Sequence, residues 1–150
     1  FRLLQPWESA VELIRLLGLD GIDVCLMEGR SSLRLEDVRA DVAGCAARLD
    51  EQVRGRGLEV ADVFVIPWTD FRTLAPNHPD AAERAASAAV FGDMLDFAAR
   101  LGAPGMTILP GIDWEHETPE ESLTRAAAES AAPFFFARVG GAWTQTAATA

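Results

Sequence analysis

Three side chains that could contact a small ligand follow apolar segments of strand length. Glu28 comes directly after the run 21–27, and its carboxylate could accept hydrogen bonds from substrate hydroxyls, although a solvated loop carboxylate is an equal expectation. Trp68 comes shortly after the run 58–66 and offers an apolar wall for a substrate ring, or else packs within its own loop. His78, in the same loop, could reach a substrate oxygen or a metal, or cap the helix that begins nearby.

The segment Asp113–Glu117 is rich in side chains that can ligate metals. His116 lies between two glutamates there, which suggests a cation site. Adjacent residues on an extended loop point in different directions, however, and the metalloprotease spacing H-E-x-x-H is absent from the sequence. A solvated loop is therefore the favoured interpretation, with Trp114 as its expected pocket residue and no metal ligand assigned. Arg84 is predicted to pair with Asp80, four residues earlier, with phosphate binding as the alternative.

These side chains must be positioned by an alternation of helices and strands. Apolar residues that recur at three- and four-residue steps predict amphipathic helices, whereas short apolar runs bounded by glycine or proline predict buried strands. The predicted helices span residues 7–17, 35–54 and 79–101, and a fourth begins at Thr118, where Thr-Pro-Glu-Glu has the pattern of a capping box. The predicted strands span residues 21–27, 58–66 and 105–111.

Strands that alternate with single helices are typical of parallel β/α folds. An open dinucleotide-binding sheet would carry a glycine-rich phosphate loop, and neither G-x-G-x-x-G nor G-x-x-x-x-G-K-[ST] occurs in the sequence. The predicted fold class is therefore α/β, a partial (β/α)8 TIM barrel of about four β/α units with parallel strands, because a full barrel takes about 250 residues. Residues 1–130 are assigned to this partial barrel. Residues 131–150 lack acidic side chains and are predicted to form an atypical C-terminal segment.

Composition and charge narrow the classes of partner. The 150 residues carry a formal net charge of -10, which opposes binding to nucleic acid and to anionic membranes, and their apolar runs are too short to span a bilayer. Cys25 and Cys45 lack the spacing of metal ligands, so we expect reduced, buried thiols in a cytoplasmic protein, of bacterial origin by its composition. Residue 1 is Phe and no signal peptide is recognised, so the chain is expected to begin partway into a gene product.

Several short motifs point to one family by their order and spacing. They are residues 17–24 and 56–60, each leading into a strand, residues 78–80 with Arg84 and Ser87 at the start of a helix, and residues 97–103 leading to residues 107–111. Over residues 6–125 the chain resembles the sugar phosphate isomerase/epimerase family, the xylose isomerase-like TIM barrels. The resemblance implies an isomerase or epimerase that acts on a small sugar, sugar phosphate or polyol-derived keto compound, with a homo-oligomer as a further expectation.

The resemblance also implies a divalent cation, Mn²⁺ or Mg²⁺ with Zn²⁺ as the alternative. Members of the family hold it through Glu, Asp, His and Glu on later strands, and two of the carboxylates transfer protons beside the sugar carbonyl. The first ligand is expected shortly after residue 135, and the segment Arg138–Trp143 contains no Glu. The parent protein is therefore expected to use the cation, whereas this chain by itself is not expected to bind one.

Two alternatives remain beside the sugar isomerase. A metal-dependent phosphodiesterase resembling endonuclease IV would share the barrel, but it would use several histidine ligands, and this chain has two histidines and a net charge of -10. A catalytically inactive barrel fragment is the other alternative. Its open sheet is expected to expose interior side chains such as Val63, Val65 and Ile108, and to promote association or poor solubility. The aromatic residues Phe134, Phe135, Phe136 and Trp143 would cover the gap in a soluble monomer.

Overall fold

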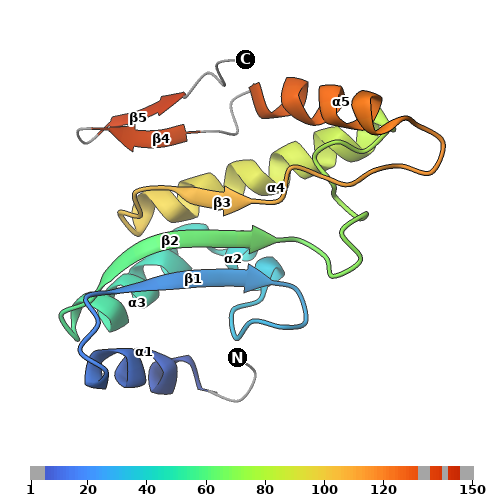
Figure 1. Cartoon of the computed structure of the whole chain (residues 1–150). Coiled ribbons are helices and arrows are strands. Elements are labelled where there is room, and N and C mark those ends of the chain that lie inside the picture. The colour runs from blue at the N-terminus through green and yellow to red at the C-terminus, as the bar shows by residue number, and fades with distance from the viewer. Residues whose placement is uncertain (1–5, 132–135, 140–141, 146–150) are drawn as a thin grey trace.

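The elements follow one another as helix and strand in alternation (Figure 1). The computed structural model describes residues 6–131, 136–139 and 142–145, and beyond residue 128 it describes the backbone only. The elements are α1 (Trp7–Leu16), β1 (Gly21–Met27), α2 (Leu35–Ala40), α3 (Val42–Arg54), β2 (Glu59–Ile66), α4 (Ala81–Arg100), β3 (Met106–Ile108), α5 (Pro119–Ala131), β4 (Phe136–Val139) and β5 (Ala142–Gln145). The predicted segment Phe134–Phe135 lies outside the described residues, and the side chains of Phe136 and Trp143 are likewise not described.

Strands β1, β2 and β3 form a three-stranded parallel sheet in that order, as the sequence predicts. All three strands run in the same direction, so the loops that follow them gather at one end of the sheet (Figure 1). Within the described residues a fourth parallel strand is not present, because β4 pairs antiparallel with β5 instead. The predicted series of about four units is therefore represented by three parallel strands and the helix α5.

One face of the sheet carries the hydrophobic core. Helices α2, α3 and α4 lie on this face (Figure 1), and alternate residues of β1 and β2 pack against them. Val24 pairs with Val63 and Leu26 with Val65, and all four side chains are fully buried. Helix α4 contributes the two largest fully buried side chains, Phe91 and Phe97, together with Met94. Because side chains alternate between the two faces of a strand, the residues between these buried valines and leucines lie on the opposite face of the sheet.

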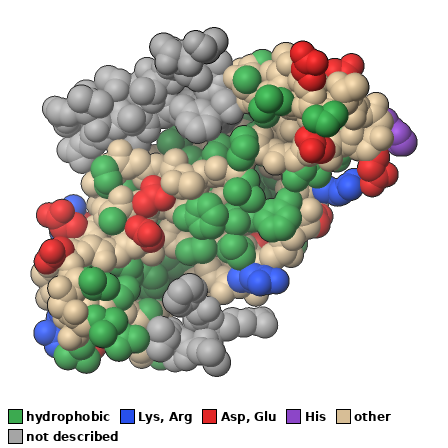
Figure 2. All heavy atoms as spheres, viewed as in Figure 1, with side chains coloured by type: hydrophobic (Ala, Val, Ile, Leu, Met, Phe, Trp, Pro, Cys, Tyr) green, Lys and Arg blue, Asp and Glu red, His purple; other side chains and the backbone are tan. Residues whose placement is uncertain are grey.

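In the part of the chain that the structure describes, no helix covers the opposite face of the sheet, which would line the interior of a complete barrel (Figure 1). Cys25 of β1, Phe64 of β2 and Thr107 of β3 are aligned across it, and none of them is buried. Figure 2 shows apolar side chains gathered in the middle of this side of the molecule. The prediction that Val63 and Val65 would be exposed is wrong, because the pleat turns both toward the helices. Association through the open face stays a prediction.

The helix predicted over residues 35–54 is broken into two. Asp41 interrupts it with a non-helical backbone (φ -151°, ψ 69°), and its Oδ1 accepts a hydrogen bond of 2.9 Å from the backbone N–H of Gly44 at the start of α3. A Cβ on Gly44 would lie 2.1 Å from Asp41 Oδ2, so a larger residue at position 44 would displace the capping carboxylate from its present position. The apolar periodicity continues across the break, with Val38 buried before it and Ala46 after it, which is why spacing alone predicted one helix.

The ends of the later elements follow recognisable local chemistry. Thr118 and Glu121 form the predicted capping box of α5: Glu121 N–H donates to Thr118 Oγ1 over 3.2 Å, and Glu121 Oε2 accepts from Thr118 N–H over 2.8 Å. Asp80 is the N-cap of α4 rather than part of its first turn. Strand β3 is shorter than predicted and ends at Ile108. In the described part of the chain, no helix is long and apolar enough to cross a membrane.

Candidate functional site

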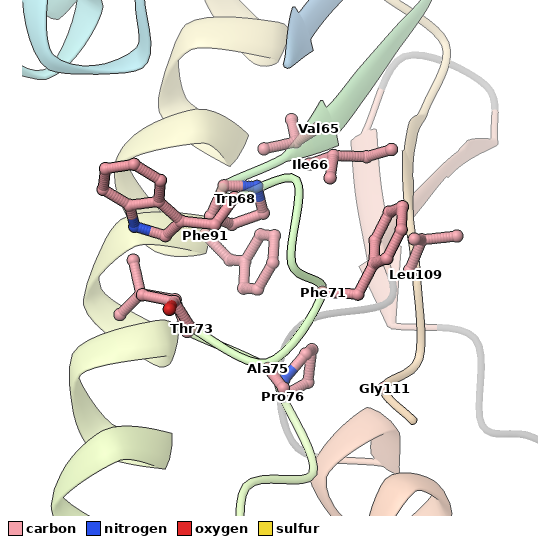
Figure 3. Close-up of a pocket in the computed structure, with 12 residues that line it drawn as sticks. Val65, Ile66, Trp68, Phe71, Thr73, Ala75, Pro76, Phe91, Leu109 and Gly111 are labelled. Atoms are coloured by element: carbon pink, nitrogen blue, oxygen red, sulfur yellow. The ribbon is translucent and has the colours of Figure 1, made fainter. Parts of the chain in front are cut away.

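An apolar hollow lies at the C-terminal ends of β2 and β3 (Figure 3). It contains about 310 Å³ of non-atom space, part of it open to solvent. Val65 and Ile66 of β2, Phe91 of α4 and Leu109 after β3 contribute to its walls. Ligand sites of parallel barrels occur at this end of the strands, so the hollow is the candidate functional site.

Trp68 lines this hollow from the loop that follows β2, as its position in the sequence predicts. In Figure 3 it lies on one side of the hollow and Phe71 lies on the other side, next to Leu109. Trp68 and Phe71 are each 46% exposed, which is unusual for aromatic side chains of this size and leaves both rings free to contact a ligand. Trp68 is a residue that the sequence predicts for the site, whereas Phe71 is not.

The loop around Phe71 has a strained backbone. Phe71 and Leu74 both have φ of 58°, in the left-handed region that residues with a Cβ rarely adopt. Asp70 holds the turn, because its carboxylate accepts hydrogen bonds from the backbone N–H groups of Arg72 (2.9 Å) and Thr73 (3.0 Å) and from the Thr73 hydroxyl (2.8 Å). The bonds from Thr73 lower the pKa of Asp70, so the carboxylate that shapes the loop is ionised at neutral pH.

Asn77 joins this loop to the segment that follows β3. Its side chain is 2% exposed, and its Nδ2 donates to the carbonyl of Ile112 (2.8 Å) and the carbonyl of Ser122 (3.3 Å). Its Oδ1 accepts from Ile112 N–H (3.2 Å) and from Trp114 Nε1–H (3.3 Å). All four hydrogen-bonding positions of the carboxamide are therefore used.

Gly111, at the edge of the hollow, packs directly against Asn77. Its φ is +129°, a conformation that favours glycine, and a Cβ built on it would lie 2.0 Å from Asn77 Oδ1. This position consequently needs glycine both for its backbone and for the space beside it. The two loops that wall the hollow thus meet at a tight contact.

His78 and Trp114, both predicted as site residues, are brought together by these loops. Their rings meet edge to face with centroids 4.6 Å apart, and the guanidinium of Arg72 lies 5.7 Å from the centroid of the Trp114 ring. His78 Nδ1 accepts a hydrogen bond of 3.1 Å from Asp80 N–H at the start of α4. This contact is the local capping role that was the alternative prediction for His78. Neither ring lines the hollow, so both support its rim from outside.

Arg84, beside this cluster, supports the entry to α4. Its guanidinium Nη1 donates to the carbonyls of His78 (2.8 Å) and Pro79 (2.9 Å). The arginine thus ties the end of the loop to the first turns of the helix.

Glu117 forms a bidentate ion pair with Arg125 of α5, which was not predicted from the sequence. Arg125 Nη1 and Nη2 donate to the two carboxylate oxygens over 2.9 and 2.5 Å, and the Ser122 hydroxyl donates a further bond of 3.1 Å. Arg125 is the main cause of the lowered pKa of Glu117. Arg125 Nη1 also donates to the backbone carbonyl of Asn77 over 3.0 Å, which ties α5 to both loops.

The other predicted site residues are placed apart from this cluster. Glu28 follows β1 and is half-buried, with its backbone N–H donating to the carbonyl of Ile66 over 3.3 Å. His116 is exposed on the loop after β3 and is not brought to the hollow. Among the side chains that the structure describes, His, Cys, Asp and Glu form no cluster of three or more that could hold a metal ion.

Comparison with known proteins places this geometry in a family. The model of the family described as xylose isomerase-like TIM barrel matches residues 11–135. The chain belongs to this family. Its parallel sheet, flanking helices and hollow at the C-terminal ends of the strands are thus part of a barrel of this type, which confirms the predicted fold class.

A solved structure extends the family comparison. The crystal structure of a D-psicose 3-epimerase in the presence of D-fructose superposes with a TM-score of 0.62 at 20% sequence identity. The match covers 82% of this chain and 40% of the epimerase chain, so the chain spans well under half the length of that enzyme. At this identity the likeness shows the fold alone. No curated protein matches the chain.

Proposed function

We propose that this chain forms the β1–β3 part of a sugar isomerase or epimerase, and that the apolar hollow holds one side of the sugar. The observation that carries the proposal is the pair of half-exposed aromatic rings, Trp68 and Phe71, at the strand ends where this family's fold places its ligands. Sugars present weakly polar C–H faces that pack on aromatic rings, while their hydroxyls need hydrogen-bonding partners. The substrate class is a small sugar, sugar phosphate or polyol-derived keto compound.

Glu28 is the proposed partner for a substrate hydroxyl. Met27 pairs with Ile66 at the end of the β1–β2 ladder, and the bond from Glu28 N–H to Ile66 O continues that pairing by one residue. Glu28 is therefore the first residue of the loop after β1, and it lies beside the end of β2, from which the loop with Trp68 starts. An ionised carboxylate accepts hydrogen bonds from hydroxyl groups, and such bonds are stronger than those between neutral partners.

The described residues do not fit a divalent cation. His78 packs on Trp114, Glu117 is paired with Arg125, and His116 is exposed at a distance from the hollow. In the proposed enzyme the cation, Mn²⁺ or Mg²⁺, and the proton-transferring carboxylates belong to other strands of the barrel. The phosphodiesterase alternative gains no supporting observation, because the described His, Cys, Asp and Glu side chains form no cluster of three or more that could hold a metal ion.

Sugar binding by the 150-residue chain tests the proposal. In saturation-transfer NMR with D-fructose, we expect transfer from the protein to the sugar C–H protons. Trp68→Ala should abolish most of this transfer, because it removes the larger half-exposed ring. Leu123→Ala is the matched control, since Leu123 is 69% exposed on α5 and does not line the hollow. Absence of transfer in the parent chain, or equal transfer in the Trp68→Ala chain, would contradict the proposal.

A further inference from the structure

The shape of the hollow depends on how two loops are held relative to each other. The loop after β2 supplies Trp68, Phe71 and Pro76, and the segment after β3 supplies Leu109 and Gly111. Neither loop is part of the sheet, in which the last register pair between β2 and β3 is Val65 with Ile108. Beyond that pair, the spacing between the walls must be set by contacts between the loops themselves.

Asn77 makes most of those contacts. Its carboxamide bonds to both the N–H and the C=O of Ile112, one residue after Gly111. It therefore holds the segment after β3 through paired backbone hydrogen bonds, as a neighbouring strand would. The remaining donor and acceptor reach Ser122 O and Trp114 Nε1, and the backbone carbonyl of Asn77 accepts from Arg125. A buried carboxamide with every position satisfied has one orientation available, because any rotation leaves buried polar groups unpaired.

We propose that Asn77 is a positioning residue of the sugar site: its carboxamide fixes the distance between the walls that carry Phe71 and Leu109, without touching the sugar. The effect of Asn77 on sugar binding rests on the proposed function, whereas its effect on the spacing of the two loops rests on the hydrogen bonds alone. Asn77 does not line the hollow, and its side chain is 2% exposed, so it acts through the two loops.

Asn77→Asp is the sharpest test because aspartate has nearly the same shape. It replaces the two Nδ2 donations with a carboxylate that faces the carbonyls of Ile112 and Ser122, so the grip on the second wall is lost while the volume is kept. We expect the dissociation constant for a ketohexose to rise at least tenfold in the Asn77→Asp chain. We also expect the backbone amide resonances of Leu109 and Gly111 to move, and the N–H of Ile112 to lose protection from hydrogen exchange.

Ser122→Ala is the matched control. Ser122 is 1% exposed, and its hydroxyl bonds to Glu117 and to the backbone N–H of Trp114. Asn77 bonds only to the backbone carbonyl of Ser122, not to this hydroxyl. Removing the hydroxyl disturbs the same cluster and leaves the carboxamide bonds in place. This chain should bind the ketohexose within threefold of the parent, and the Leu109 and Gly111 resonances should stay near their parent positions.

The outcomes separate this inference from the proposed function. If the parent chain binds no ketohexose, the proposed function fails, and the amide shifts and the Ile112 exchange rate still decide whether Asn77 sets the wall. If the parent binds and the folded Asn77→Asp chain binds within twofold of it, the positioning role is wrong. Equal loss of binding in the Ser122→Ala chain would also overturn it.

If the Asn77→Asp chain does not fold, Trp114→Phe provides a second test, because it removes a single bond to the carboxamide. This change should shift the Gly111 resonance, and an unmoved resonance would refute the inference.

Discussion

Replacing Gly111 with alanine should destabilise the chain far more than a glycine-to-alanine change usually does. The added Cβ would lie 2.0 Å from Asn77 Oδ1 and 2.1 Å from its Cγ, well inside van der Waals contact. The backbone also has φ of +129°, which an L-residue with a Cβ rarely adopts. The chain must therefore either strain residue 111 or move the Asn77 carboxamide away from its partners.

The size of the effect follows from these two costs. A residue held in a sparsely populated backbone region costs about 1–3 kcal/mol. Forcing an extra carbon into a packed site costs about another 1–3 kcal/mol. The free energy of unfolding should fall by about 2–6 kcal/mol, a large part of the roughly 5–15 kcal/mol typical of a domain. For a chain of this size, the midpoint of thermal unfolding should fall by about 5–20 °C.

Thermal unfolding followed by circular dichroism at 222 nm measures this shift, and Gly92→Ala provides the control. Gly92 lies within α4, and a Cβ built there meets nothing within 4 Å outside the backbone of its own helix. Alanine is the better helix former, so this change should raise the free energy of unfolding by about 0.5–1 kcal/mol. The two substitutions add the same methyl group and should move the midpoint in opposite directions. A Gly111→Ala chain as stable as the Gly92→Ala chain would refute the packing argument.

Three further predictions concern charge, capping and catalysis. Arg125 lowers the pKa of Glu117, so the stability from this ion pair is present above about pH 4.5 and is lost as the pH falls through the lowered pKa. Urea unfolding from pH 5 to pH 3 should therefore show a smaller loss of stability in the Glu117→Gln chain than in the parent. Asp41→Ala removes the N-cap of α3 and should cost about 1 kcal/mol, whereas the same change at the exposed Asp113 should leave the urea midpoint unchanged. The 150-residue chain with Mn²⁺ or Mg²⁺ should not epimerise a keto sugar, and metal-dependent turnover would show that Glu28, His78 or His116 supplies the ligands.

The strands could be predicted closely because their chemistry is local. β1 begins at Gly21 and ends at Met27 as predicted, since glycine precedes the apolar run and glycine follows soon after it. The capping box of α5 was also predicted, because both partners lie within four residues. The break at Asp41 was not, because an aspartate inside a periodic apolar pattern fits a helix surface as well as a cap. The direction of Val63 and Val65 was predicted wrongly because alternation separates two faces without saying which face the helices cover.

Part of the candidate site was also predictable, because it follows directly from the local sequence signals of the strands. Trp68 follows the end of a strand, so its place at the hollow could be inferred once the strand was recognised. Asn77 could not be distinguished from other turn-forming residues, because its partners Ile112 and Ser122 lie 35 and 45 residues away in the sequence. Two signals were available in the sequence, an asparagine between Pro76 and His78 and a glycine at position 111. Only the fold shows that the two residues meet.

The order of the strands has a consequence for how the chain folds as it is synthesised. Gly21 pairs with Glu59 and Val63 pairs with Met106, which are separations of 38 and 43 residues along the chain. Strands β2 and β3 each pair with the strand before them across the helices in between, so pairing within the β1–β2 unit needs no residue beyond Ile66. The loops around Asn77 then close only after α5 has been made, because Ser122 and Arg125 supply two of their bonds. The hollow is consequently the last feature of these residues to acquire its shape, whereas the sheet beneath it forms earlier.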